Sequence, residues 1–136
     1  MMDVRMVNRR FSFADSEVAA VAVEEGLLRV RFAAANVSEP DATVFSGQRQ
    51  GFVSGVELVC RGGPWPDGLD GLAGRLAEGR LSLYGAWLTQ LALPGELGEA
   101  SRLELRFAQG GDFAVAVTGV SLNTPHDAVL SESFAC

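Results

Sequence analysis

Two short segments of the chain alternate between apolar and polar residues. In residues 27–33 and 102–108 the apolar side chains fall on every second position, and arginine or glutamate occupies most positions between them. A period of two is typical of a β-strand with one buried face and one solvated face. Glycines in the neighbouring residues 24–26 and 109–112 permit the positive φ angles of tight turns. The pattern therefore predicts two β-hairpins.

The strand that pairs with residues 27–33 is expected at residues 17–24, and the strand that pairs with residues 102–108 is expected at residues 113–120. In both segments valine and alanine lie on both faces of the predicted strand. Strands that are apolar on both faces are usually central in a sheet or covered on both sides, so we expect these two to be central. Further strands are predicted at residues 52–61 and at residues 80–93, the latter with a turn or bulge at Gly85.

The number of strands and the spacing of the turns define the expected fold class. With short strands around Phe11 and Phe134, the chain holds about seven to nine strands, separated by turn signals roughly every 8–12 residues. Parallel strands would need crossover helices that this sequence lacks, so antiparallel pairing is expected. The prediction is an all-β fold, an antiparallel β-sandwich or barrel with at most one short helix, formed by residues 1–136 as one domain.

One segment leaves the choice between helix and extended chain open. Residues 69–78 carry leucine and alanine at helical spacing, but glycines interrupt the stripe. Each glycine costs a helix about 1 kcal/mol relative to alanine, so a short helix and an extended or turn segment are both weighed. Residues 36–51 and 62–68 are rich in glycine, proline and polar residues and are expected to form surface loops.

Composition narrows the classes of partner. The hydrophobic fraction of 48% is that of a chain with a packed core, and the absence of lysine and isoleucine indicates a GC-rich bacterial genome. A net charge of −6 repels polyanions, so nucleic acid is an unlikely partner. No apolar run at the start resembles a signal peptide, and none approaches the roughly 18 residues of a membrane span. A cytoplasmic protein without membrane contact is expected.

Few residues offer catalytic or metal chemistry. The single histidine, His126, is the only general base at neutral pH and lies in a turn-like stretch, where a solvated side chain is the simpler interpretation. Cys60 and Cys136 are expected to be free thiols in a reducing compartment, and one histidine cannot complete a Cys/His zinc set. No GxSxG or phosphate-binding glycine motif occurs. The sequence thus disfavours an enzyme and predicts no catalytic residue, metal or cofactor.

One loop residue and two arginine pairs are candidates for binding. Prolines flank Trp65 in a stiff loop, where the indole either anchors a partner or folds back over the core. Arg29 with Arg31, and Arg102 with Arg106, project from the wet faces of the two clearest strands. If both strands lie in one sheet, the four guanidinium groups can face one anionic group or an acidic protein patch. Charge pairing with acidic residues such as Glu104 is the alternative.

These observations support two hypotheses of function. The first is a non-catalytic binding domain for a protein partner, immunity-like, antitoxin-like or accessory, with homodimerisation through open sheet edges also allowed. The second is a small-molecule-binding β-barrel, either a binding protein or an enzyme, whose interior pocket is lined by Tyr84, Trp87 and His126. The binding residues expected under the first hypothesis are Trp65, Asp67, Arg29, Arg31 and Arg106, together with the polar loop 46–50.

Overall fold

The computed structural model describes residues 8–125 and 128–131. In this part of the chain there are ten strands and no helix, and the strands pair antiparallel throughout. The predicted all-β, antiparallel fold is confirmed, with slightly more strands than expected. No helix in the same residues is long and apolar enough to cross a membrane. The strands are β1 (Arg9–Glu24), β2 (Leu27–Pro40), β3 (Gln48–Val53), β4 (Glu57–Gly62), β5 (Gly74–Leu83), β6 (Ala86–Leu88), β7 (Gln90–Leu93), β8 (Gly95–Leu97), β9 (Ala100–Phe107) and β10 (Asp112–Asn123).

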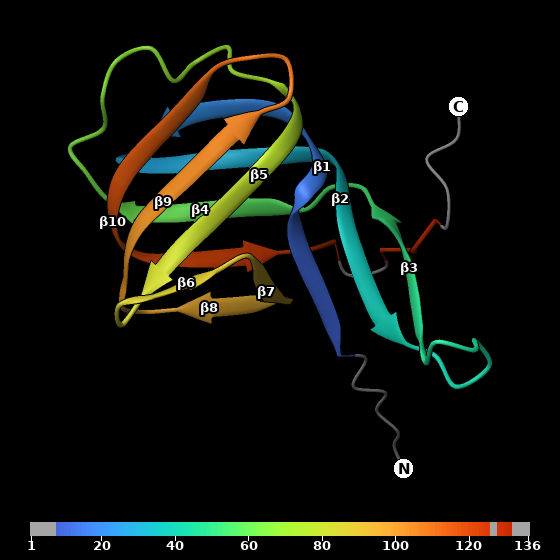
Figure 1. Cartoon of the computed structure of the whole chain (residues 1–136). Helices are drawn as coiled ribbons and strands as arrows, with labels where there is room; N and C mark the ends of the chain where they lie inside the picture. The colour runs from blue at the N-terminus through green and yellow to red at the C-terminus, as the bar shows by residue number, and fades with distance from the viewer. Residues whose placement is uncertain (1–7, 126–127, 132–136) are drawn as a thin grey trace.

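Six of these strands close into a barrel-like ring (Figure 1). Their order around the ring is β1, β2, β4, β10, β9 and β5, and β5 pairs with β1 to complete it. The two strands predicted to be central, β1 and β10, have hydrogen-bonded neighbours on both edges. In this ring β2 and β9 lie three strands apart in either direction, which places them on opposite sides of the barrel.

The two longest strands leave the barrel and form a second, smaller sheet. β1 has 16 residues and β2 has 14, and in Figure 1 both run out of the ring on the side where β3 lies. The first residues of β1 pair with β7, and the last residues of β2 pair with β3. This sheet, in the order β7, β1, β2, β3, is called the arm below. Residues Ala128–Ser131 reach the arm, where Ser131 forms an isolated bridge with Phe52 of β3.

A bulge in β1 marks the passage from arm to barrel. The β1–β2 register shifts between Ser12 and Glu17, and Asp15 adopts a φ of 69°. The Ser16 side chain is fully buried at this point; its hydroxyl donates to the Ser12 carbonyl at 2.7 Å and accepts from the Asn36 amide at 2.8 Å. An extra residue in one strand bends it and increases its twist. The serine thus supplies the hydrogen bonds that the interrupted ladder lacks.

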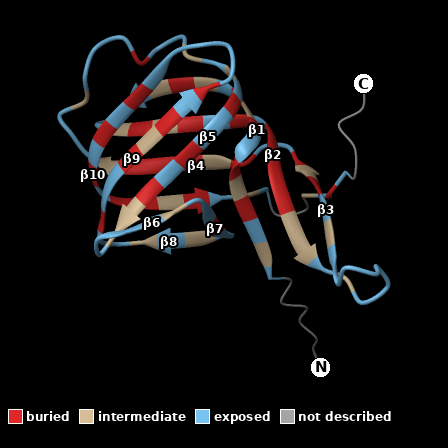
Figure 2. Cartoon of the chain, in the orientation of Figure 1, coloured by how far each residue is buried: buried red, intermediate tan, exposed pale blue. Residues whose placement is uncertain are grey.

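Apolar side chains fill the inside of the ring. Figure 2 shows buried residues on each of the six ring strands. Phe11 packs edge-on against Phe13 and Phe32, with ring centroids 5.0 and 5.1 Å apart. Gly79 of β5 faces this cluster, and a Cβ built there would lie 2.8 Å from the Phe13 Cβ. A glycine in a strand often marks such a close approach, and here it lets the Phe13 side chain lie directly against β5.

The structure shows which conformation is adopted by the segments that the sequence left undecided or predicted as loops. Residues 69–78 form no helix: turns with positive φ at Gly68 and Gly71 are followed by β5, which starts at Gly74. The expectation of a surface loop over residues 36–51 is wrong, because most of this segment belongs to β2 and β3. Residues 52–61 are likewise two strands, β3 and β4, separated by a short turn. The strand expected around Phe134 lies outside the described residues.

Candidate functional site

Trp65 packs against the core next to the β1–β2 turn. It is partly buried against the core, and its Nε1 donates a hydrogen bond of 3.0 Å to the carbonyl of Gly26, in the β1–β2 turn. Of the two interpretations offered by the sequence, these contacts fit an indole that folds back over the core. Asp67, two residues later, is exposed in the same loop.

Arg29 and Arg31 are held by acidic residues of neighbouring strands. Both guanidinium groups contact Glu57 of β4, at 3.2 and 3.1 Å, and both also contact Glu24 of β1. Two arginines thus face two glutamates across three adjacent strands. Cross-strand charge pairing, the alternative weighed from the sequence, accounts for this arrangement.

The second arginine pair lies on the other side of the ring. Arg102 and Arg106 belong to β9, three strands away from β2, so the structure does not bring the four guanidinium groups together. Arg102 pairs with Glu104 at 2.8 Å, and Arg106 pairs with Glu78. Hydrogen bonds from Arg102 and, with a smaller effect, from Arg80 hold the pKa of Glu104 below its ordinary value. A single anionic ligand contacting both pairs is therefore excluded by the strand order.

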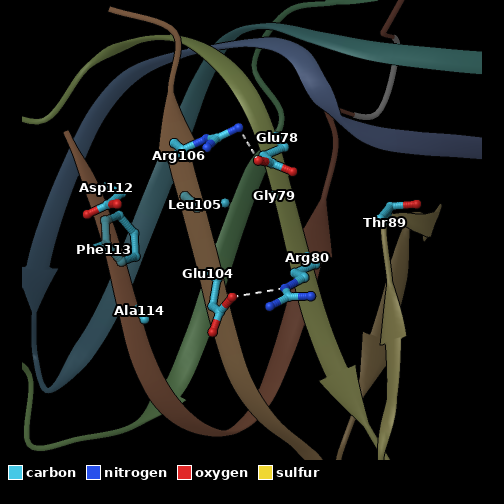
Figure 3. Close-up of a pocket in the computed structure, with 10 residues that line it drawn as sticks. All are labelled: Glu78, Gly79, Arg80, Thr89, Glu104, Leu105, Arg106, Asp112, Phe113 and Ala114. Carbon is cyan, nitrogen blue, oxygen red and sulfur yellow. Dashed lines mark hydrogen bonds and ion pairs between the residues drawn. The ribbon is translucent and has the colours of Figure 1, made fainter. Parts of the chain in front are cut away.

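A groove of about 510 Å³ lies near these residues, on the outer face of β5, β9 and β10 (Figure 3). Small residues at its floor, including Gly79 and Ala114, leave room between longer charged side chains. In Figure 3 the two ion pairs, Arg106 with Glu78 and Arg80 with Glu104, cross the groove between β9 and β5. Because both arginines of the lining are paired with glutamates and Asp112 adds another carboxylate, the groove offers no unpaired positive charge to an anionic ligand.

Two of the three residues expected to line an interior pocket, Tyr84 and Trp87, lie on the surface instead. Tyr84 is 77% exposed in the turn between β5 and β6, and Trp87 is 41% exposed, with the Arg80 guanidinium 3.9 Å from its ring centroid. A hydrogen bond with Glu99, together with the negative charge of that residue, raises the pKa of Tyr84. His126 lies outside the described residues. The aromatic pair therefore belongs to the barrel surface.

Metal and thiol chemistry find little support in the described part of the chain. Residues 8–125 and 128–131 contain no group of three or more His, Cys, Asp or Glu side chains placed to hold a metal ion. Cys60 is buried in the core, and this burial raises the pKa of its thiol to about 12. At neutral pH the thiol stays protonated, and a protonated thiol is a poor nucleophile. Cys136 lies outside the described residues.

The tip of the β2–β3 hairpin presents a fully exposed phenylalanine. Phe45 lies in residues 41–47, which join β2 to β3 at the far end of the arm (Figures 1 and 2). The Asp41 carboxylate accepts hydrogen bonds from the Thr43 amide at 2.9 Å and from the Thr43 hydroxyl at 2.6 Å. Backbone hydrogen bonds also join Asp41 to Gly47, Val44 to Asp41, and Gly47 to Val44. The tip is thus a closed loop that holds Phe45 out into solvent.

Sequence reasoning missed this tip, although part of the predicted contact loop 46–50 lies beside it. Phe45 is the only aromatic residue of residues 36–51, and a lone aromatic in a polar segment was the available signal. Trp65 and Asp67 do not lie at the tip. Trp65 forms a hydrogen bond with Gly26, just before the start of β2, whereas the tip follows the end of β2. Binding by Trp65, Asp67, Arg29, Arg31 and Arg106 stays a prediction.

Comparisons of the chain with protein-family models, with curated proteins and with solved structures found no match.

Proposed function

We propose that this chain is a non-catalytic protein-binding domain that contacts its partner through the tip of the β2–β3 hairpin. The observation that carries the proposal is the complete exposure of Phe45 on an internally hydrogen-bonded loop. An exposed phenylalanine adds nothing to the core of its own chain, whereas a buried aromatic anchor is a common source of binding energy at protein interfaces.

The closed loop favours binding because the tip is already ordered. Fixing a flexible side chain or loop costs free energy on association, and a preformed loop reduces that cost. At this tip the Asp41 carboxylate accepts a hydrogen bond from Thr43, the Ser46 hydroxyl donates to the carbonyl of Gln48 at the start of β3, and Gly47 supplies a positive φ of 82°. The backbone that carries Phe45 is therefore held in place before any partner arrives.

Photocrosslinking in the cells that make the protein tests the proposal. A benzophenone amino acid replaces Phe45 in the full chain, and irradiated cells are analysed for covalent adducts by mass spectrometry. The matched control carries the same group in place of Tyr84, which is 77% exposed but lies in the β5–β6 turn. We expect a discrete protein adduct from position 45 and none from position 84. No adduct at position 45, or equal adducts at both positions, would contradict the proposal.

A further inference from the structure

An apolar hollow lies beside the arm. It has a volume of about 220 Å³ and is lined mainly by apolar groups, among them Leu88, Leu97, Val120 and Leu122. Leu88 and Leu97 are only partly buried, so the hollow is open to solvent. An apolar cavity of about 150 Å³ is large enough to bind benzene. The hollow therefore has room for the ring of one phenylalanine side chain.

Charge at the rim of the hollow complements charge at the hairpin tip. Arg10 and Glu96 both line the hollow. The Glu96 carboxylate lies 3.9 Å from the Arg61 guanidinium, whereas Arg10 alone among the arginines in the described part of the chain forms no ion pair. At the tip, hydrogen bonds from the Thr43 side chain and backbone hold the pKa of Asp41 below its ordinary value, so its carboxylate is ionised at neutral pH. The tip thus presents an aromatic ring with an anion, and the hollow presents an apolar pocket with a cation.

The tip and the hollow face the same side of the molecule. Arg10 pairs with Ser38 across the β1–β2 ladder, only three residues before Asp41. In Figure 1 the hairpin projects on the same lower side of the molecule as β7 and β8, which contribute to the hollow. Phe45 is fully exposed, so it does not occupy the hollow of its own chain. Two complementary surfaces on one side of a molecule suit a closed dimer, in which a twofold axis makes each contact twice.

We propose that the partner of the hairpin tip is a second copy of this chain, whose hollow receives Phe45 while its Arg10 approaches Asp41. The contact is reciprocal, so each copy gives one tip and receives one. This inference rests on the proposed function and names the partner of the same tip.

The first test measures the mass of the full chain in solution by sedimentation velocity over a range of concentrations. We expect the native chain to dimerise. Two variants each remove one half of the contact: Phe45→Ala removes the ring, and Ala92→Trp fills the hollow from an exposed position on its lining. Loss of a central aromatic anchor weakens an interface by about 30-fold or more, so each variant alone should be monomeric where the native chain is dimeric.

Mixing the two variants separates a lost contact from a lost fold. The Phe45→Ala chain keeps its hollow and the Ala92→Trp chain keeps its tip, so an equal mixture should form a heterodimer through one contact, weaker than the native dimer. Both variants should retain the far-ultraviolet circular dichroism of the native chain. A native chain that stays monomeric, a Phe45→Ala chain that dimerises as well as the native one, or a mixture without heterodimer would overturn the inference.

The crosslinked adducts distinguish this inference from the function on which it rests. An adduct that joins position 45 to residues 88–97 of a second copy supports both. An adduct with a different protein, together with a monomeric native chain, overturns the second-copy inference and leaves the protein-binding function supported. Absence of any adduct at position 45 contradicts the protein-binding function itself.

Discussion

At the scale of single residues, Gly79 shows how closely the barrel wall approaches its core. A Cβ at this position would lie 2.8 Å from the Leu105 Cδ2 and 2.8 Å from the Phe13 Cβ. Contacts this short force neighbouring atoms to move, and a close-packed interior has little free space into which they can move. The glycine is therefore a packing requirement of the β5–β9 wall and not a turn residue.

Gly79→Ala tests this requirement. We expect the variant to lower the free energy of unfolding by about 1–3 kcal/mol, the usual cost of overpacking a core. The measurement is urea denaturation followed by tryptophan fluorescence. Gly98→Ala is the matched control, because a Cβ there meets no atom within 4 Å, and its stability should stay within about 0.5 kcal/mol of the native value. Equal stability of the two variants would show that the wall relaxes around the added methyl group.

At the scale of elements, the β1 bulge allows one strand to serve two sheets. Before the bulge β1 pairs with β7 in the arm, and after it β1 pairs with β5 in the barrel. Asn36 supports the same place from β2, donating from its side chain to the Ala14 carbonyl at 3.0 Å. The direction of the arm relative to the barrel thus depends on a few buried polar contacts.

Ser16→Ala should weaken this junction. Removing the hydroxyl leaves the buried Asn36 amide and the Ser12 carbonyl without their hydrogen bonds of 2.8 and 2.7 Å to Ser16, and an unsatisfied buried polar group costs about 1–3 kcal/mol. Thermal denaturation compares it with Ser101→Ala, a change at an exposed position of β9. A Ser16→Ala chain as stable as the Ser101→Ala chain would mean that the hydroxyl adds nothing to the junction.

The predictable elements are those whose pattern of burial appears directly in the sequence. The alternation in residues 27–33 and 102–108 became β2 and β9, because one face of each strand is buried and the other is wet. Residues 36–51 concealed a hairpin because polar residues dominate it, and its buried positions, such as Val37 and Gly51, are few. The tip at Phe45 was missed because isolated loop aromatics carry no period.

At the scale of the whole molecule, strand order decided what local patterns left open. The alternating pattern of β2 and β9 does not reveal which strands lie between them. From the sequence, their arginines could therefore have met on one sheet face, but the strand order of the ring keeps them apart. The ring itself is uneven. β1 and β5 pair at only two positions, Glu17 with Arg75 and Val18 with Gly74, whereas β10 pairs with β4 over six residue pairs.

Hydrogen exchange should reveal this uneven closure. Local opening is easiest where few backbone hydrogen bonds hold an element, so amides at the β1–β5 seam should exchange faster than those of residues 120–122, which pair with both β4 and β8. Exchange followed by mass spectrometry or NMR measures the two rates. Equal protection of both regions would indicate that the ring opens as one unit.

The position of β10 along the chain also has a consequence for synthesis. A ribosome releases the chain from the N-terminus onward, and β10 is the last strand of the described residues. Yet β4, β8 and β9 each pair with β10 along one edge. Until residue 123 has emerged, these strands have an unbonded edge, which is a template for pairing with other chains. The ring therefore forms late during translation, and a nascent chain stalled before β10 is a substrate for chaperones or a seed for aggregation.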